Sequence, residues 1–437
     1  MTDLAAARAL VGAGRFDAAL KLLAALPEGP GRAVVLAAAH VGRKEGAQAL
    51  AALEGADPAD PEALFHAGRA HLLASNAFAA VAAFERLRAG HPGFPGLAEA
   101  LAGAYRRDAR YADCVALAGG APPSRQLAYE AAVSLWRLGE AEAALAAFDA
   151  LLSAHPDHAA SWVGSAAPAL DLAGLDEAAR RVGRALACAG ANGKYWALLA
   201  VLHALGGRDA EAADIRRRHV DADPRRRPLA DSVAALPRPG RVFGVSRALL
   251  RHAMAEARIP GLVLEFGVRR GTSLGHLAEV AGQEVHGFDS FEGLPEDWGR
   301  ERAGVLTTGR QLPNVHPLAR LHPGWFADTL PGFLAAHPGP ARLVNVDSDI
   351  YASARTVLTH LAPRVVPGTV LVFDEMIGNR TWRDDEYRAW MEFVAATGIA
   401  WEVVALSPFT KQVAVRVMRV PQGSMGEGGR EGVAAGC

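Results

Sequence analysis

The sequence has little cysteine, and this excludes two kinds of site. Its three cysteines, Cys114, Cys188 and Cys437, form no CxxC pair. We therefore expect neither a disulfide framework nor a zinc site built from thiolates. Cysteine used in this way is typical of proteins in a reducing cytosol, and we predict a cytoplasmic protein.

The chain also lacks an excess of either charge and lacks long apolar runs. Lys+Arg number 46 and Asp+Glu number 47, which gives a formal net charge of -1. We therefore predict no nucleic-acid partner and no anionic membrane partner. MTDLAAARAL has an early acid and no basic segment, so we expect no secretory signal. No run approaches the length of a membrane span. At 437 residues and 51% hydrophobic content, the chain is expected to be globular, with two or three domains.

The first half, residues 1–224, is rich in alanine and leucine and repeats itself. Pro58 and Pro92 lie 34 residues apart, as do Trp162 and Trp196. A period near 34 is typical of repeats made of two helices and a turn. The sequence therefore predicts a helical repeat array.

Residues 61–92 show the pattern inside one repeat. Small residues at Gly68 and Ala80 are expected to let paired helices approach, and Phe84 to fill the seam between them. Pro92 is expected to stop the second helix. This half resembles the tetratricopeptide repeat family over about six units. It then forms a concave surface for a protein or peptide partner, or a helical extension that only supports or oligomerises the second half.

The junction between the halves is rich in proline and arginine. We predict a linker over residues 225–243, a second domain over 244–420 and a disordered, glycine-rich tail over 421–437. The arginine run 225–227 is expected to be solvated, with phosphate binding as the alternative.

The second half alternates apolar, β-rich runs with amphipathic segments. Such alternation is typical of a parallel sheet covered on both faces. The last two runs have no helix between them, which indicates an antiparallel pair at one end of the sheet. The predicted strands are 262–267, 284–290, 341–349, 369–375, 401–406 and 412–420.

Acids stand where the predicted strands end. Ligands of parallel sheets bind beyond the carboxyl ends of the strands. Carboxylates gathered there repel one another unless a cation neutralises them, and oxygen ligands suit Mg²⁺. The acids at these ends are Glu265, Asp289, Asp347, Asp349, Asp374 and Glu375.

The turn in LEFGVRRGTSLGHL joins a strand to a helix through Gly267 and Gly271. Gly267 permits a sharp turn, and the helix that follows presents free backbone N–H groups. The loop is neither G-x-G-x-x-G nor a phosphate-binding loop. Glu265 would repel phosphate but can hold a cationic aminoacyl group, and Asp289 can accept hydrogen bonds from ribose hydroxyls. These features favour S-adenosylmethionine, with an unrelated strand-turn-helix as the alternative.

Three longer strings carry a second resemblance. EFGVRRGTSLGHLAEVAGQEVHGFDSFEGLPEDW, GWFADTLP and VDSDIYASARTVLTHLAPRVVPGTVLVFDE resemble the macrocin O-methyltransferase family, over about residues 260–415. The resemblance implies an S-adenosylmethionine-dependent enzyme that methylates sugar hydroxyls of natural products. The expected fold class is a helical repeat array followed by a Rossmann-like methyltransferase domain. Its sheet is mostly parallel, with a terminal antiparallel strand pair.

The resemblance also implies roles for the acids. Asp347, Asp374 and Glu375 are the implied metal ligands, and Asp349 is the implied general base. Ser348 stands where the family has glycine, and Glu375 where it has aspartate. In the expected mechanism Mg²⁺ coordinates two adjacent acceptor hydroxyls, Asp349 removes a proton, and the oxygen attacks the sulfonium methyl. The predicted cofactor-binding residues are Glu265, Gly267, Gly271, Ser273, Asp289 and Ser290.

Several residues near the strand ends have two interpretations, in the site or in the supporting structure. Segment 380–390 either walls the acceptor site or forms a solvated amphipathic helix. The function also has alternatives: a repeat-based scaffold with an inactive methyltransferase-like domain, or a nucleotide-dependent oxidoreductase, which the missing third glycine disfavours. The individual residues with two interpretations are Trp325, Phe326, Tyr351, His316 and His322.

Overall fold

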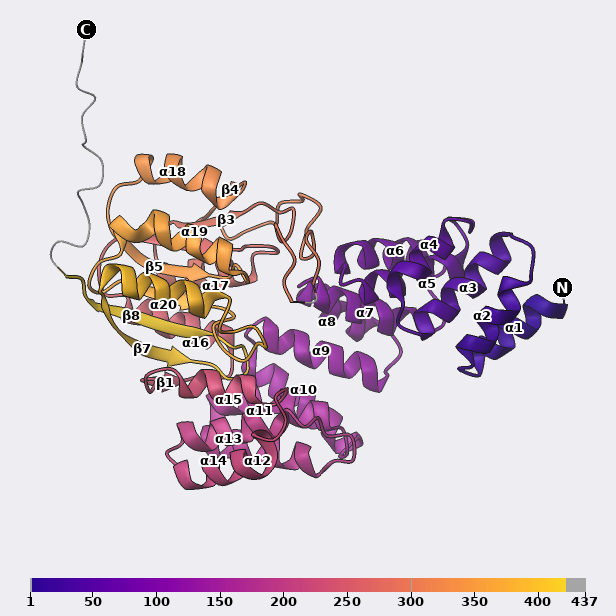
Figure 1. Ribbon diagram of the computed structural model, residues 1–437, viewed down its shortest axis with the longest axis horizontal. Coiled ribbons are helices and arrows are strands. Elements are labelled where there is room, and N and C mark those ends of the chain that lie inside the picture. Colours follow the sequence, from indigo (N-terminus) through magenta and orange to yellow (C-terminus); the bar gives the residue numbers. More distant parts are fainter. Residues whose placement is uncertain (1, 300, 422–437) are drawn as a thin grey trace, which may run out of the picture. The chain divides into compact units, whose positions relative to one another are not determined.

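The structure is a computed structural model that describes residues 2–299 and 301–421 (Figure 1). The chain divides into two compact units. One contains residues 1–156 together with 291–312, and the other contains 157–290 together with 313–437. The predicted tail, residues 421–437, lies outside the described residues except for Pro421.

The first unit is built from helices that pack against their neighbours in sequence. Asp60 shows how such a helix begins: its carboxylate accepts the backbone N–H groups of Glu62 and Ala63, and Pro61 occupies the first turn. The helices of this unit are α1 (Thr2–Gly12), α2 (Phe16–Ala24), α3 (Pro30–Gly42), α4 (Gly46–Leu53), α5 (Pro61–Leu73), α6 (Ala77–Gly90), α7 (Leu97–Arg107), α8 (Tyr111–Gly120), α9 (Arg125–Arg137) and α10 (Ala141–Ala154).

The predicted seam between paired helices is confirmed. Phe84 of α6 is fully buried, and a Cβ added to Gly68 of α5 would come within 2.5 Å of its ring. A glycine also meets an aromatic ring between two successive pairs, where a Cβ at Gly42 of α3 would overlap the ring of Phe16 of α2. Glycine therefore sets the spacing of these helix pairs.

Residues 291–312 also belong to the first unit, although they follow a strand of the second unit in sequence. A Cβ added to Gly309 would come within 2.6 Å of the Phe78 ring of α6. The compact units therefore do not divide at residue 224, where the composition of the sequence changes.

The second unit begins with further helices of the array. Residues 225–243, predicted as a linker, hold helix α15 and strand β1, so this stretch is folded. Pro228 starts the helix, and Ala230 and Ser232 bury one of its faces. The helices here are α11 (Ala159–Ala173), α12 (Leu175–Ala187), α13 (Tyr195–Leu205), α14 (Asp209–Ile215), the π-helix η1 (Arg216–Val220) and α15 (Arg227–Ala234).

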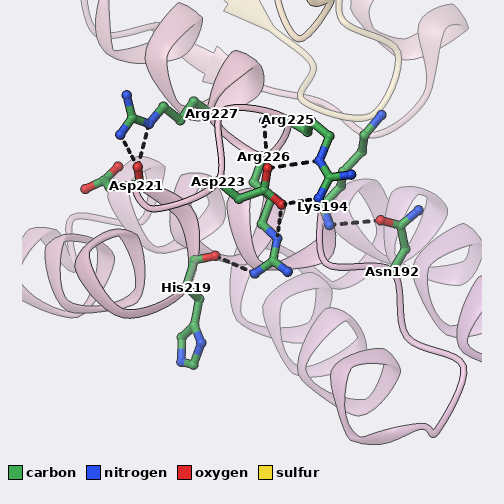
Figure 2. A network of polar contacts seen from close by, with 8 residues as sticks. All are labelled: Asn192, Lys194, His219, Asp221, Asp223, Arg225, Arg226 and Arg227. Atoms are coloured by element: carbon green, nitrogen blue, oxygen red, sulfur yellow. Dashed lines mark hydrogen bonds and ion pairs between the residues drawn. The ribbon is translucent and has the colours of Figure 1, made fainter.

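The arginine run holds the turn between η1 and α15 (Figure 2). Arg225 donates to the carboxylate of Asp223 at 3.1 Å, and Arg227 donates to the backbone carbonyl of Asp221 at 2.7 Å. Arg225 and Arg227 are exposed, as predicted, but their guanidinium groups also hold this turn in place.

The sheet of the second unit has the order β1-β7-β8-β6-β5-β2-β3-β4. Strand β8 runs antiparallel to β6 and β7, and the other pairs are parallel, which confirms the predicted fold class. Strands β1 and β4, at the two edges, were not predicted. The strands are β1 (Arg241–Val242), β2 (Leu262–Phe266), β3 (Val285–Asp289), β4 (Ala319–Pro323), β5 (Ala341–Val346), β6 (Val370–Phe373), β7 (Ala400–Leu406) and β8 (Val413–Arg419).

Helices cover both faces of the sheet, as the buried strands require. Helices α16 (Ser246–Glu256) and α17 (Thr272–Ala281) lie on one face. Helices α18 (Phe326–Ala336), α19 (Tyr351–Leu361) and α20 (Glu386–Thr397) lie on the other, in front in Figure 1. All four residues of β6 are buried. The core is therefore continuous from strand to helix, and polar side chains collect at the strand ends.

Helix α11 of the array is hydrogen-bonded to the segment between β1 and α16. The carboxylate of Asp171 in α11 accepts the backbone N–H groups of Gly244 and Val245 at 2.8 and 2.9 Å. Within residues 2–299 and 301–421, no helix combines the length and the apolar character needed to cross a bilayer.

Candidate active site

The turn from β2 to α17 depends on two glycines. Gly267 has φ 96° and donates its N–H to the carbonyl of Phe288 at 2.9 Å. A Cβ at Gly267 would overlap the carbonyl oxygen of Asp347. Gly271 has φ 78° and precedes the first residue of α17. Both conformations favour glycine, and Gly267 lets the ends of β2 and β5 meet closely.

Glu265 lies beneath this turn and is fully buried. Its two carboxylate oxygens accept hydrogen bonds from the Ser273 hydroxyl at 3.1 Å and from the Asn345 amide at 3.0 Å. Burial raises the pKa of Glu265 to about 8, against the smaller lowering by these two hydrogen bonds. Both donors are neutral, so the protein supplies no positive charge in contact with this carboxylate, and a cationic ligand would supply one.

Asp289, at the end of β3, holds the same turn. Its Oδ2 accepts the backbone N–H groups of Val268 and Arg269 at 2.9 and 2.7 Å. Ser290 follows it directly. The structure therefore brings the predicted cofactor residues to one edge of the sheet, while contact of Asp289 with a ribose stays a prediction.

The four remaining acids follow the ends of β5 and β6. The hydrogen bonds between the strands continue into these residues. The backbone N–H of Asp347 donates to the carbonyl of Phe266 at 2.8 Å, and that of Asp374 donates to the carbonyl of Val346 at 2.9 Å. Burial, followed by the charges of Asp374 and Asp349, raises the pKa of Asp347 well above its ordinary range. Asp347 and Asp374 therefore continue two paired strands and lie close enough for their charges to interact.

Asp349 has the left-handed backbone conformation, φ 62°, which aspartate tolerates better than most residues. Burial, and then the charges of Glu375 and Asp374, raise its pKa to about 7. The cations Arg269 and Lys411 act in the opposite direction. Asp349 thus lies between acids and cations at the strand ends.

Asp374 and Glu375 are held by donors from the chain itself. Gln412 donates to Asp374 Oδ1 at 2.7 Å. Lys411 Nζ lies 2.8 Å from Glu375 Oε2, and Asn379 donates to the same oxygen. We refer to Glu375, Asn379 and Lys411 as the lysine cluster.

Glu386, the first residue of α20, is a further buried acid at this edge. It accepts the backbone N–H of Ser348 at 3.3 Å and that of Glu375 at 3.0 Å. Segment 380–390 is therefore more than a solvated helix, because the carboxylate of Glu386 connects the loops that follow β5 and β6. The signal in the sequence was the spacing of Glu386 and Trp390, which puts this acid on the apolar face of the helix.

The metal site implied by the resemblance does not fit these contacts. Across the described part of the chain, no group of three or more His, Cys, Asp or Glu side chains is arranged to hold a metal ion. The physical reason lies in the donors: Glu375 Oε2 faces an ammonium and an amide, and Asp374 Oδ1 faces an amide. Mg²⁺ would need to displace these donors from both carboxylates.

The residues with two interpretations mostly support structure. Tyr351 donates to Glu392 at 2.6 Å and so links α19 to α20. His322 lies in β4, and its ring stacks on Phe288 at 4.6 Å. His316 Nδ1 accepts the N–H of Leu318, 3.2 Å away, within a turn. Phe326 contacts the Phe266 ring edge-on at 5.4 Å, and Trp325 is 38% exposed.

Comparison with known proteins agrees with this geometry. Residues 264–376 match a family profile described as a methyltransferase domain, and they include every predicted site residue. A tetracenomycin-C 4'-O-methyltransferase acting on a dimethoxyrhamnosyl compound, from Streptomyces olivaceus, is 31% identical over 27% of this chain and 53% of its own. Demethyldecarbamoylnovobiocin O-methyltransferase of Streptomyces niveus is 31% identical over 30% of this chain and 59% of its own. The chain thus spans less than two thirds of either relative.

Solved structures show similarities to the two parts separately. A calicheamicin methyltransferase is 23% identical, covers 39% of this chain and 76% of its own, and has a TM-score of 0.32. A thermophilic TPR protein of Thermus thermophilus is 22% identical, covers 40% of this chain and 98% of its own, and has a TM-score of 0.34. On the profile match, residues 264–376 of this chain are similar to the methyltransferase domain family.

Proposed function

We propose that this protein is an S-adenosylmethionine-dependent O-methyltransferase that acts on a hydroxyl of a sugar or a glycosylated small molecule. The observation that carries the proposal is Glu265, buried between two neutral donors beneath a glycine turn. A buried carboxylate with a raised pKa favours a cationic ligand, and S-adenosylmethionine is cationic and carries no phosphate. The names of the relatives supply the acceptor class.

The proposed reaction moves one methyl group. Asp349 accepts the proton of an acceptor hydroxyl while that oxygen forms a bond to the sulfonium methyl carbon. The carbon–sulfur bond breaks, and its electron pair stays on sulfur. The products are a methyl ether and S-adenosylhomocysteine. The protein's main contribution is to hold the two reactants in line at the ends of β2 and β5.

The proposal involves no divalent metal, because the donors on Asp374 and Glu375 do not favour one. The helical repeats keep their predicted role as a surface for a protein or peptide partner. In this scheme they position a substrate for the domain at residues 264–376.

The test is calorimetric titration of the full chain with S-adenosylmethionine and S-adenosylhomocysteine. We expect saturable binding, and we expect Asp289→Ala to weaken it at least about tenfold, which corresponds to ~1.4 kcal/mol. Asp328→Ala, in the first turn of α18, is the matched control and should leave affinity unchanged.

Turnover is then measured with labelled cofactor against glycosylated natural products. Asp349→Asn should bind the cofactor normally and lose methyl transfer. Wild-type protein that binds neither compound would instead support a repeat-based scaffold with an inactive domain. Cofactor binding that is insensitive to Asp289→Ala would show that the ribose lies elsewhere.

A further inference from the structure

The lysine cluster occupies the place where the resemblance implies a metal. Lys411 Nζ contacts two oxygens of the chain, Glu375 Oε2 at 2.8 Å and Asn379 Oδ1 at 2.6 Å. An ammonium group has three donors, so one remains beyond these two contacts. Glu375 is 18% exposed and Lys411 is 37% exposed at their side chains, so the cluster borders solvent and is reachable by a ligand.

The turn between β7 and β8 is built to aim this lysine. Ser407 donates its N–H to the carbonyl of Gln412 at 2.8 Å, and its hydroxyl accepts the N–H of Thr410 at 3.1 Å. Lys411 itself has φ 65°, a left-handed conformation that these bonds hold in place. The following residue, Gln412, reaches Asp374. One short turn thus sends two adjacent side chains to two adjacent acids.

The chain also packs against the aliphatic part of Lys411. A Cβ added to Gly378 would lie 3.4 Å from Lys411 Cγ and Cδ. Gly378 in turn donates its N–H to the Ser232 hydroxyl of α15 at 3.0 Å. The loop after β6 therefore lies beside the lysine stem, and the contacts with Glu375 and Asn379 fix the position of the ammonium.

The choice of lysine is informative in this chain. Lysine accounts for four of the 46 basic residues, and arginine for the rest. An ammonium is a compact point charge, whereas a guanidinium is a planar fork. A point charge among oxygens is the closest side-chain equivalent of a small cation.

We propose that Lys411 is the built-in cation of this site, that it takes the place of a divalent metal at Asp374 and Glu375, and that it positions the acceptor hydroxyl near Asp349. The inference rests on the proposed methyl transfer and adds the source of positive charge. Lys411 acts as a positioning residue: its ammonium offsets the carboxylates and keeps metal ions away from them.

The test measures metal binding directly and needs no acceptor. Protein freed of metal with EDTA is titrated with Mn²⁺, followed by electron paramagnetic resonance of the free ion, and with Mg²⁺ by calorimetry. Wild-type protein should show no saturable site. Lys411→Gln leaves Glu375 without its ammonium, so we expect this variant to gain a saturable Mn²⁺ site with an affinity at least about tenfold above any binding by the wild-type protein.

Two variants separate charge from structure. Lys411→Arg keeps the positive charge and should not gain the metal site. Lys44→Gln is the matched control, because Lys44 has the same backbone conformation, φ 65°, and lies in the helical array. A merely structural lysine would lower stability when replaced but would not create a metal site.

Saturable, stoichiometric binding of Mg²⁺ or Mn²⁺ to wild-type protein, lost in Glu375→Gln, would overturn the proposal. That measurement uses no lysine variant, so it decides the matter even if Lys411→Gln fails to fold. Titration with S-adenosylmethionine in EDTA is run in parallel. Loss of cofactor binding there would count against the proposed function, whereas metal binding would count against Lys411 alone.

Discussion

Two glutamates at the same edge of the sheet, Glu265 fully buried and Glu375 partly exposed, have their charges balanced in opposite ways. Glu265, in β2, accepts hydrogen bonds from the neutral side chains of Ser273 and Asn345. Glu375, after β6, faces the ammonium of Lys411. The first arrangement favours the neutral acid until a cationic ligand stabilises its charged form, whereas the protein itself balances the charge of the second. The same residue type therefore marks a ligand site in one place and an internal ion pair in the other.

The two arrangements differ because their partners come from different distances along the chain. Ser273 lies eight residues after Glu265, in the helix that the same turn begins. Lys411 lies 36 residues after Glu375, beyond a helix and a strand. A local motif reveals the first environment, whereas only the folded sheet reveals the second.

Gly267→Ala should have the largest effect, because it disturbs the arrangement of the two glutamates at the strand ends. A Cβ at Gly267 would overlap the Asp347 carbonyl, and the residue has φ 96°. The ends of β2 and β5 must then separate, which moves Glu265 away from the second group of acids. We expect the free energy of unfolding to fall by about 3 kcal/mol or more, with loss of cofactor binding. Urea denaturation measures the change.

Gly275→Ala is the control for that variant. Gly275 lies within α17, and a Cβ there would meet no atom within 4 Å. Alanine should stabilise this helix by up to about 1 kcal/mol. Equal destabilisation by both substitutions would show that the close approach at Gly267 is unimportant.

Most of the fold was predictable because its elements obey simple periodicities. Strands β2, β3, β5 and β6 are short apolar runs between amphipathic helices, and the acids that follow them are visible in the sequence. Strand β4 was missed because ARLHP lies at a sheet edge and contains a charged residue, a histidine and a proline. Strand β1 has two residues and no pattern of its own.

The site was predictable only as a set of acids. Glu386 was missed because its importance comes from two backbone N–H groups in other loops, those of Ser348 and Glu375. Lys411 was missed because the expected metal accounted for the same charges. The sequence shows which acids follow a strand. It does not show that the balancing charge comes from Lys411, which lies in a turn between two other strands.

Glu265→Gln should have an intermediate effect, and it tests the charge of the first glutamate without changing the second. Glutamine keeps the shape and one of the two accepting oxygens, and it removes the negative charge proposed to bind the cofactor. We expect affinity for S-adenosylmethionine to fall about tenfold or more, while Glu279→Gln, on the exposed side of α17, leaves it unchanged. Unchanged affinity in Glu265→Gln would mean that this carboxylate does not recognise the cofactor.

The same variant should change how stability depends on pH. The folded protein raises the pKa of Glu265 from 4.5 to about 8, so the folded state holds the proton more tightly than the unfolded state. The stability from this group is complete below about pH 4.5 and is lost as pH rises through about 8. Glu265→Gln removes that loss, so its advantage over wild type should grow as pH rises from 4.5 to about 8. Urea denaturation at both pH values, without cofactor, measures it; an advantage independent of pH would contradict the assignment.

Ser348→Ala should have the smallest effect, and it tests the second group of acids. Ser348 is 6% exposed, and its hydroxyl has no hydrogen-bond partner among the residues that the structure describes. Removing a buried, unpaired hydroxyl should leave stability unchanged or raise it by about 1 kcal/mol. Ser232→Ala is the contrast, because that hydroxyl accepts from Gly378 and donates to Leu229, both at 3.0 Å, and its loss should cost about 1–2 kcal/mol. Equal losses in both variants would mean that Ser348 already has a partner. If Ser348→Ala leaves the stability of the free protein unchanged but weakens acceptor binding, the missing hydrogen-bond partner of Ser348 is the acceptor. Lys411 then balances the charge of the second group of acids, and Ser348 remains as a polar contact for the substrate.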